Sequence, residues 1–252
     1  MLFLSITLFY LKVLIETGCG VWYTFGKEVD VVNIAENVLK YGLRNVYFLT
    51  GTALAGKTTM VREISAKHGF FPFYDNWHEE RFEVFRSICE ERYQPQSTKK
   101  RETTDWEAFF GRSVEEFLAD AGDYGEYDEY IEFMIIELIK ISRDRKVVTD
   151  IGMPLELLTQ ISEYNRIACL LASPEMVTCE NYGKREDHRE FLECILSLKE
   201  PEKKIAVQDE LFRRGVRKAY EDVEKYKLFS VVRTEESTVR GTLGMLERHF
   251  GL

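Results

Sequence analysis

One stretch of this chain carries a complete motif for binding phosphate groups. The residues from Gly51 to Thr58 fit the pattern G-x-x-x-x-G-K-[ST] without a mismatch. The apolar run Asn45–Thr50 before them is typical of a buried parallel strand, and Thr59–Lys67 after them has apolar residues at helical spacing. A strand, a glycine-rich loop and a helix in this order predict a phosphate-binding loop. A chance glycine-rich turn is the alternative, and it would not need these flanks.

The motif predicts a role for each residue of the loop. Gly51 and Gly56 permit backbone conformations and close approaches that a Cβ atom would block. The loop amides then turn inward around phosphate oxygens, at the positive end of the following helix. We expect Lys57 to reach the β- and γ-phosphates and the Thr58 hydroxyl to hold Mg²⁺. The expected nucleotide-binding residues form one run: Gly51, Thr52, Ala53, Leu54, Ala55, Gly56, Lys57, Thr58 and Thr59.

The composition is that of a globular protein and excludes several function classes. The 252 residues are 45% hydrophobic and 31% charged, which suits one large domain with a substantial core. The net charge of −9 argues against a general nucleic-acid binder. The five cysteines include no C-x-x-C pair, so neither a zinc site nor a disulfide framework is expected. Reduced thiols in a cytoplasmic protein are the default.

Residues 1–30 are expected to form an apolar extension of a domain that spans residues 31–252. The apolar run Met1–Ile15 is too short to span a membrane and is interrupted by Lys12. It also lacks the basic start and the small cleavage-site residues of a signal peptide. We therefore expect no membrane partner. This apolar run is expected to be either a strand or helix packed on the domain, or an upstream extension that comes from an over-long reading frame.

The rest of the chain alternates short apolar runs with amphipathic helices. The five main expected strands are residues 45–50, 70–74, 146–150, 166–172 and 228–232. The main expected helices are residues 30–41, 59–67, 78–92, 126–142, 154–164, 191–196, 202–226 and 239–250. Because strands and helices alternate, the sequence predicts an α/β fold whose parallel sheet is covered on both faces. Pro72 lies inside the second strand and favours an edge position for it.

Polar residues directly follow several of these strands. Ligands of open parallel sheets bind beyond the carboxyl ends of the strands. Thr50, Asp75, Asp150 and Ser173 all fall there. We therefore expect one rim of the sheet, next to the phosphate-binding loop, to gather the functional side chains.

These features resemble the nucleotide and shikimate kinase-like branch of the P-loop proteins. The resemblance covers residues 45–252 and rests on the loop, on Asp150 and Gly152 after the third strand, and on the basic stretch Lys184–Arg189 after the fourth. It implies a three-layer P-loop NTPase fold with a parallel sheet of about five strands. It also implies a helical insertion after the second strand, at residues 78–142, and a lid after the fourth, at residues 180–200. In that branch ATP is the usual donor, the lid supplies arginines, and the acceptor lies under the insertion.

The resemblance implies catalytic roles for Lys57 and for several residues outside the loop. Asp150 would act on Mg²⁺ through water, although an Asp at a strand end also caps helices. Asp75 would orient or deprotonate an acceptor hydroxyl, the alternative being a turn or helix cap. Arg185 and Arg189, spaced i and i+4, would share one face and stabilise the moving phosphoryl group, or else belong to a solvated face. No arginine follows the turn at Pro154, where nucleotide kinases have one, which argues against a nucleoside monophosphate acceptor.

Two classes of function remain open at this point. The first is a small-molecule kinase that uses ATP, Mg²⁺ and a small acceptor. The second is a nucleotide-dependent ATPase or switch, or a kinase that acts on a macromolecule or a sugar nucleotide. The chain has no N-K-x-D guanine motif, and Asp150 is followed by Ile151 instead of the glutamate of an AAA-type motor. The sequence identifies neither the acceptor nor the oligomeric state.

Overall fold

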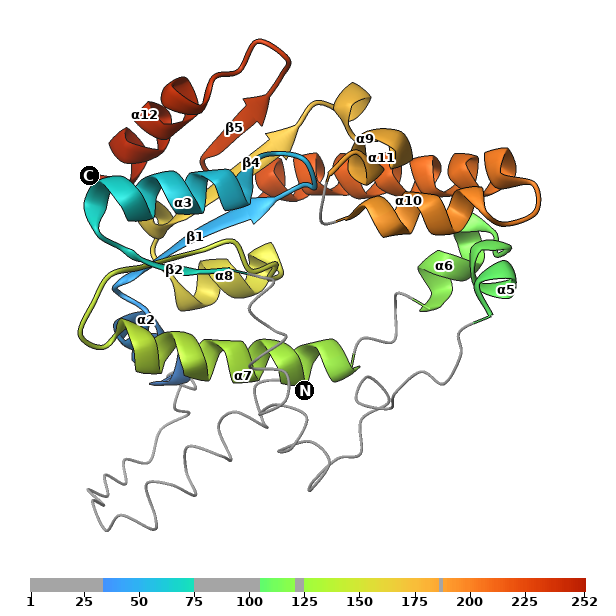
Figure 1. Cartoon of the computed structure of the whole chain (residues 1–252). Helices are drawn as coiled ribbons and strands as arrows, with labels where there is room; N and C mark the ends of the chain where they lie inside the picture. The colour runs from blue at the N-terminus through green and yellow to red at the C-terminus, as the bar shows by residue number, and fades with distance from the viewer. Residues whose placement is uncertain (1–33, 75–104, 121–124, 186–187) are drawn as a thin grey trace, which may run out of the picture.

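The computed structural model describes residues 34–74, 105–120, 125–185 and 188–252. Within these ranges lies a five-stranded, wholly parallel sheet with the strand order β2-β3-β1-β4-β5 (Figure 1). The strands are β1 (Val46–Gly51), β2 (Phe71–Phe73), β3 (Val147–Thr149), β4 (Ile167–Ala172) and β5 (Ser230–Arg233). The predicted parallel sheet of about five strands is therefore confirmed.

The strand that leads into the phosphate-binding motif occupies the centre of the sheet. All of Val46–Thr50 is buried, as is every residue of β4, so both strands are covered on two faces. Single turns of 3₁₀ helix, η3 (Tyr164–Arg166) and η4 (Pro174–Met176), precede and follow β4. Pro72 lies in β2 at the edge of the sheet, as predicted, because proline has no N–H to donate to a second neighbour.

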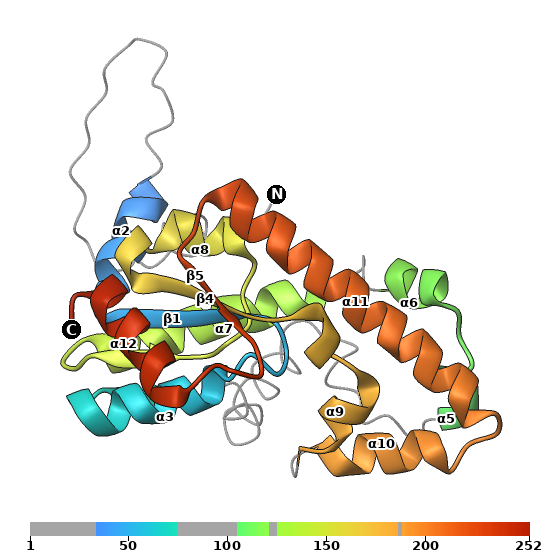
Figure 2. The ribbon, with the colours of Figure 1, turned by 90° about the horizontal axis from the view of Figure 1, so that it is seen from above.

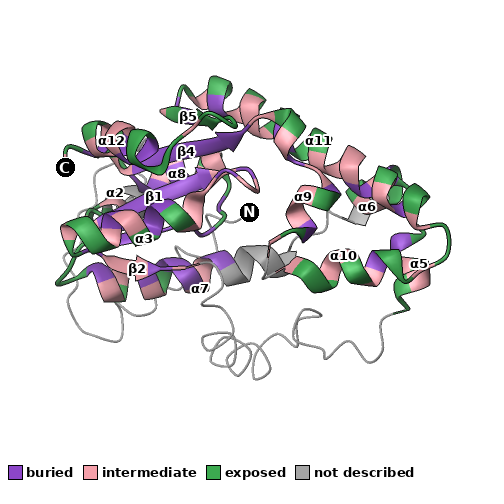
Figure 3. Ribbon diagram, turned by 45° about the horizontal axis from the view of Figure 1, so that its top comes forward, coloured by how far each residue is buried: buried purple, intermediate pink, exposed green. Residues whose placement is uncertain are grey.

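Helices cover both faces of the sheet, and each face has its own apolar core (Figure 3). Neighbouring residues of a strand point to opposite faces, so Val46 and Phe48 belong to one core and Tyr47 and Leu49 to the other. The helices that contribute to the first core include α2 (Ile34–Gly42), α7 (Gly125–Ser142) and α8 (Leu155–Ile161). Those that contribute to the second include α3 (Lys57–His68) and α12 (Val239–Phe250). The result is the predicted three-layer α/β fold.

The remaining helices lie beyond the carboxyl ends of the strands and form what we call the helical lobe (Figure 2). It consists of α5 (Trp106–Phe110), α6 (Val114–Asp120), α9 (Cys179–Gly183), α10 (Arg189–Leu196) and the amino-terminal half of α11 (Pro201–Tyr226). A small apolar core of Phe110, Cys179 and Ile195 lies among these helices. The carboxyl-terminal half of α11 returns to the sheet, where Val216 and Val223 are buried against it.

The helical lobe joins two segments that the sequence analysis treats separately. Helices α5 and α6 follow β2 in the expected insertion, whereas α9 and α10 lie in the segment expected to form the lid. The Nζ atom of Lys204, in α11, donates to Oε1 of Glu107 in α5 at 2.7 Å and to the carbonyl oxygen of Lys199 at 2.6 Å. Glu107 also accepts from the N–H of Lys199 at 3.1 Å. The hydrogen bonds from Lys204 and Lys199 hold the pKa of Glu107 below its ordinary value.

Some of the predictions concern residues outside the described ranges. They are the extension at residues 1–30, the expected acceptor-contacting role of Asp75 and the helix at residues 78–92. Of the helices that the structure describes, none has the length and apolar character needed to cross a membrane.

Candidate functional site

Gly51 ends β1 at a position where only glycine fits. Its φ of 117° lies in the region that favours glycine. A Cβ atom added to Gly51 would lie 1.9 Å from the carbonyl oxygen of Leu170 in the neighbouring strand β4. The same carbonyl accepts a hydrogen bond from the N–H of Thr52 at 3.0 Å, and the Thr52 hydroxyl accepts one from the N–H of Ala172 at 2.7 Å. The first half of the loop is therefore held directly against β4.

The second half of the loop enters α3 through backbone with positive φ. Leu54 has a φ of 60°, and Gly56, which immediately precedes α3, has a φ of 86°. Within the described residues no side chain caps α3, and its first turn contains no acidic residue. Because the first amides of a helix lack partners within the helix and carry its positive partial charge, this end of α3 suits an anionic ligand.

Lys57 places its ammonium group beside the loop that precedes it. The Nζ atom donates to the carbonyl oxygen of Thr52 at 2.7 Å and to that of Gly51 at 3.3 Å. The side chain is therefore folded back over the loop, with its positive charge next to the amino-terminal end of α3. Loop, helix end and ammonium together make this the most anion-attracting geometry that we find in the described part of the chain.

Thr58 and Asp150 meet at the carboxyl ends of β1 and β3. The Thr58 hydroxyl donates to Oδ2 of Asp150 at 2.5 Å. Asp150 is only 4% exposed and directly follows β3, which pairs with β1. It does not cap the next helix, because α8 begins after Pro154 without a side-chain cap. The alternative interpretation of Asp150 as a helix cap is therefore wrong.

The chemistry of this pair fits a magnesium ion that arrives with a phosphate-bearing ligand. A hydroxyl and a carboxylate oxygen are hard donors of the kind that Mg²⁺ prefers. Among the described residues, no group of three or more His, Cys, Asp or Glu side chains is arranged to hold a metal ion. Mg²⁺ does not need one, since it commonly takes one or two protein ligands and completes its shell with water and phosphate oxygens.

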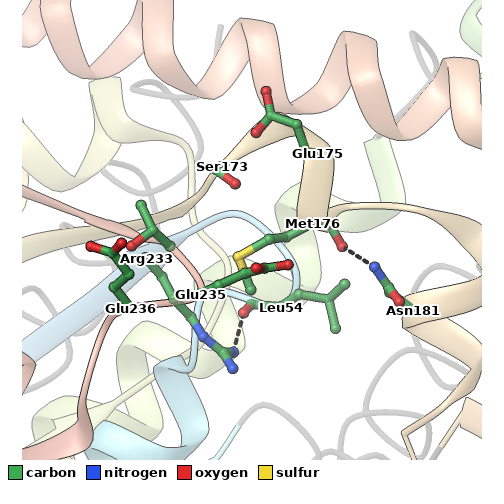
Figure 4. A pocket seen from close by; sticks show the side chains of 9 residues that line it. Leu54, Ser173, Glu175, Met176, Asn181, Arg233, Glu235 and Glu236 are labelled. Atoms are coloured by element: carbon green, nitrogen blue, oxygen red, sulfur yellow. Dashed lines mark hydrogen bonds between the residues drawn. The ribbon is translucent and has the colours of Figure 1, made fainter.

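A cavity of about 780 Å³ lies beside the loop, at the carboxyl ends of β4 and β5 (Figure 4). Its lining residues come from the loop, the turn after β4, α9, the end of β5 and the segment after it: Leu54, Ser173, Glu175, Met176, Asn181, Arg233, Thr234, Glu235 and Glu236. Asn181 donates to the carbonyl oxygen of Met176 at 3.1 Å, which ties α9 to the turn after β4. The volume is within the range of small-molecule sites, and Leu54 makes the cavity continuous with the loop.

Burial raises the pKa of three weakly acidic side chains in the sheet and the helices beside it. Burial and, secondarily, the Glu175 carboxylate raise the pKa of Tyr220, whose hydroxyl donates to the carbonyl oxygen of Ala172 at 3.3 Å. Burial raises the pKa of Cys169 to about 12. Burial and then Asp209 raise the pKa of Cys179 to about 11. Neither thiol is a nucleophile at neutral pH, because the thiolate is the reactive form.

The structure separates the two arginines expected in the lid. Arg185 lies after α9, with its guanidinium carbon 5.9 Å from the centre of the Tyr182 ring, whereas Arg189 is the first residue of α10 and is exposed. Because α9 ends at Gly183 and α10 begins at Arg189, the two arginines do not lie on one described helix, and the expected shared face is not seen. His188 stacks on Tyr182 with 4.2 Å between ring centres, which supports a structural role for this histidine. Neither arginine lines the cavity.

The rim of the sheet carries residues that the sequence analysis placed there and others that it missed. Thr50 is buried at the end of β1, and Ser173 lines the cavity. Arg233 was missed, because the fifth strand was expected to end one residue earlier, at Val232. The rule that carboxyl ends of parallel strands share a rim would have included it. Asn181 was missed because nothing in its sequence context marks it.

Comparison with known proteins yields only distant likenesses. No protein-family model matches the chain, and neither does any curated protein. Solved structures that match include shikimate kinase from Bacteroides thetaiotaomicron, with 16% identity and a TM-score of 0.39 over 82% of this chain and 98% of that one. They also include shikimate kinase from Acinetobacter baumannii in complex with shikimate, with 15% identity and a TM-score of 0.36 over 82% and 93% of the two chains.

Structures with such low sequence identity and TM-score give no information about the substrate of this protein. The fold is assigned from the geometry of the chain itself. The parallel sheet, the glycine-rich loop after its central strand and the acidic residue at the end of the adjacent strand are all present. The chain therefore has a three-layer α/β fold of the P-loop NTPase type.

Proposed function

We propose that this protein is an ATP-dependent phosphotransferase that moves the γ-phosphoryl group to a small-molecule acceptor. The observation that carries the proposal is the hydrogen bond between Thr58 and Asp150 at the start of α3. It brings together the two oxygen ligands that phosphoryl transfer needs for its metal, next to Lys57 and the loop amides.

The residues of the loop would bind and orient the phosphates. The loop amides after Thr52, whose own N–H is bonded to the Leu170 carbonyl, would surround the phosphate oxygens, as the absence of any side-chain cap on α3 among the described residues allows. Lys57 would exchange its two carbonyl acceptors for phosphate oxygens, because a charged acceptor binds an ammonium group more strongly than a neutral one. A magnesium ion bound by Thr58 and Asp150 would supply neutralisation of the phosphate charge.

The position of the loop suggests where the nucleoside and the acceptor would bind. The nucleoside would occupy the cavity that shares Leu54 with the loop. The acceptor would lie near Asp75, which is proposed to orient or deprotonate its hydroxyl. Arg185 and Arg189 are proposed to add positive charge around the moving phosphoryl group, each from its own element, the segment after α9 and the start of α10. We propose a cytoplasmic enzyme without nucleic-acid or membrane partners.

The test is ATP turnover with Mg²⁺ in the presence of a panel of acceptors. The panel comprises nucleosides, nucleotides, shikimate-like acids, sugars and aminoglycosides. We expect a single acceptor class to stimulate turnover in the wild type and in Lys140→Ala, an exposed lysine of α7. Turnover should fall by at least about a hundredfold in Lys57→Ala, since charge stabilisation at the phosphates is typically worth that much.

The result that contradicts the proposal is equally specific. If ATP binds tightly and no acceptor stimulates turnover, the small-molecule kinase is excluded. The site would then serve a switch, an ATPase or a kinase of a macromolecule or sugar nucleotide.

A further inference from the structure

Arg233 links the two walls of the cavity beside the phosphate-binding loop. It is the last residue of β5, and Nη1 of its guanidinium donates to the carbonyl oxygen of Leu54 (Figure 4). Its backbone is fixed by β4, because Arg233 pairs with Ala172 and its carbonyl oxygen accepts from the N–H of Ser173 at 2.9 Å. A flexible side chain is thus anchored at its base by the sheet and at its tip by the loop.

The guanidinium lies against the residue that opens α3. A Cβ atom added to Gly56 would find Nη1 of Arg233 4.0 Å away and no nearer contact. Gly56 is the residue at which the anion-attracting end of α3 begins. Arg233 is therefore placed at the edge of the phosphate position, on the side of the cavity.

Arg233 is the positive charge in a cavity lining that otherwise carries negative charge. Among the nine lining residues Arg233 is the sole cation, whereas Glu175, Glu235 and Glu236 contribute three carboxylates. A phosphate-bearing ligand that enters the cavity meets net negative charge, and only Arg233 offsets it from within the lining. An arginine presents five N–H donors in a planar fork that matches phosphate oxygens, and one of these donors is used by Leu54.

We infer that Arg233 is a nucleotide-binding residue whose guanidinium donates to phosphate oxygens of the bound nucleotide while the Leu54 carbonyl orients it. This inference rests on the proposed function, because it takes the ligand to be a nucleotide. It adds a phosphate-binding group from the end of β5, outside the loop motif and outside the segment expected to form the lid. The competing role is a strut that only holds Leu54 in place.

The experiment measures binding of a nonhydrolysable ATP analogue with Mg²⁺, and of inorganic tripolyphosphate, by calorimetric titration. The variants are Arg233→Gln, whose shorter neutral side chain removes both the charge and the Nη1 donor to the Leu54 carbonyl, and Arg233→Lys, which keeps the charge. Arg240→Gln, an exposed arginine in α12, is the matched control. We expect Arg233→Gln to weaken both ligands by about tenfold or more, as loss of a charged hydrogen bond does. Arg233→Lys should restore part of the loss, and Arg240→Gln should leave both affinities unchanged.

Salt dependence separates a phosphate contact from a strut. If the guanidinium contacts phosphates, the difference between wild type and Arg233→Gln shrinks as the salt concentration rises. A loss that does not depend on salt, or that spares tripolyphosphate, would overturn the inference, as would Arg233→Gln affinities equal to those of the control. Failure of the proposed function looks different, because the wild type itself would then bind neither ligand, or Lys57→Ala would bind both as well as the wild type.

Discussion

At the scale of single residues, the site depends on how closely the end of β1 approaches β4. The carbonyl oxygen of Leu170 occupies the space that any side chain at position 51 would need, and it also accepts the N–H of Thr52. The loop cannot move away from β4 without losing that hydrogen bond. Gly51 therefore permits the backbone conformation of the loop, and its lack of a side chain also allows the hydrogen bond from Thr52 that holds the loop against β4.

This contact predicts that Gly51→Ala is damaging out of proportion to its size. The added Cβ atom would meet backbone at 1.9 Å and would require a φ that alanine rarely adopts. We expect a loss of about 3 kcal/mol in the free energy of unfolding and a large loss of nucleotide affinity. Urea denaturation and calorimetric titration measure the two effects.

The matched control is Gly69→Ala at the other end of α3. Gly69 also has a positive φ, 69°, but an added Cβ atom would meet no other atom within 4 Å. We expect it to cost about 1 kcal/mol and to leave nucleotide affinity unchanged. Equal losses of affinity in the two variants would show that the contact with Leu170 does not position the loop.

Only some of the individual residues of the site could be predicted from the sequence. The loop residues and Asp150 could be predicted because their types and spacing are constrained by phosphate and metal chemistry. Arg233 could not be identified as a partner of Leu54, because the two are 179 residues apart and no motif contains both. The i, i+4 spacing of Arg185 and Arg189 gives a shared face only when both residues lie on one helix, whereas Arg185 lies after the end of α9 and Arg189 begins α10.

At the scale of elements, the contact between α5 and α11 is the feature that most affects how the lobe behaves. The Lys204 side chain is 9% exposed, and two of its hydrogen bonds go to Glu107 and to the Lys199 carbonyl. Phe110 of α5 belongs to the small apolar core with Cys179 and Ile195, against which Ile205 of α11 packs. An amphipathic pattern predicts that each of these helices has an inward face, but it does not say which helix that face meets.

We predict that Lys204→Met loosens α5 from the rest of the lobe. Glu107 would lose its charged donor, and its pKa would return toward the ordinary value, because the bond from Lys204 is the largest cause of its lowering. Hydrogen exchange measured by mass spectrometry should become faster in α5 and α6 and stay unchanged in the helices that cover the sheet. Lys203→Met is the control, since Lys203 is exposed and pairs with Glu200. Equal exchange in both variants would contradict the prediction.

At the scale of the whole molecule, the last helix, α12, contacts α3, which lies early in the chain. Glu247 in α12 accepts from Nζ of Lys67 at 2.6 Å and lies 2.7 Å from Nε2 of His68, both at the end of α3. The hydrogen bonds from Lys67 and then His68 lower the pKa of Glu247 from 4.5. The last helix is thus joined to the helix that begins at the phosphate-binding loop.

This link predicts a pH dependence of global stability. A carboxyl group whose pKa is lowered by folding stabilises the native state above its ordinary pKa, and that contribution is lost as pH falls through the lowered value. The wild type should therefore be more stable than Glu247→Gln above about pH 4.5, and the difference should vanish in more acidic solution. Urea denaturation over a pH series measures it, with Glu224→Gln on the exposed side of α11 as control. A difference that persists unchanged into acid would exclude the ionised carboxylate as its source.

The architecture of the sheet was the most predictable part of the molecule. The continuous apolar run at β1 indicated a buried parallel strand, and Pro72 favoured an edge position for β2, as the structure shows. The helical lobe was not predictable, because α5 and α11 meet through side chains roughly a hundred positions apart. Local periodicity reports burial but carries no information about such distant partners.

The continuity of α11 has a mechanical consequence. Its 26 residues make a rod about 39 Å long, with one end inside the lobe and the other packed on the sheet. Because both ends of α11 are packed, the helical lobe could rotate relative to the sheet only if α11 bent or lost its contacts with β4. Gly215, near its middle, is exposed and has no atom of another element within 4 Å of where a Cβ would lie. Because glycine is the residue least constrained in its backbone conformation, we expect any bend of α11 to occur at Gly215 most readily.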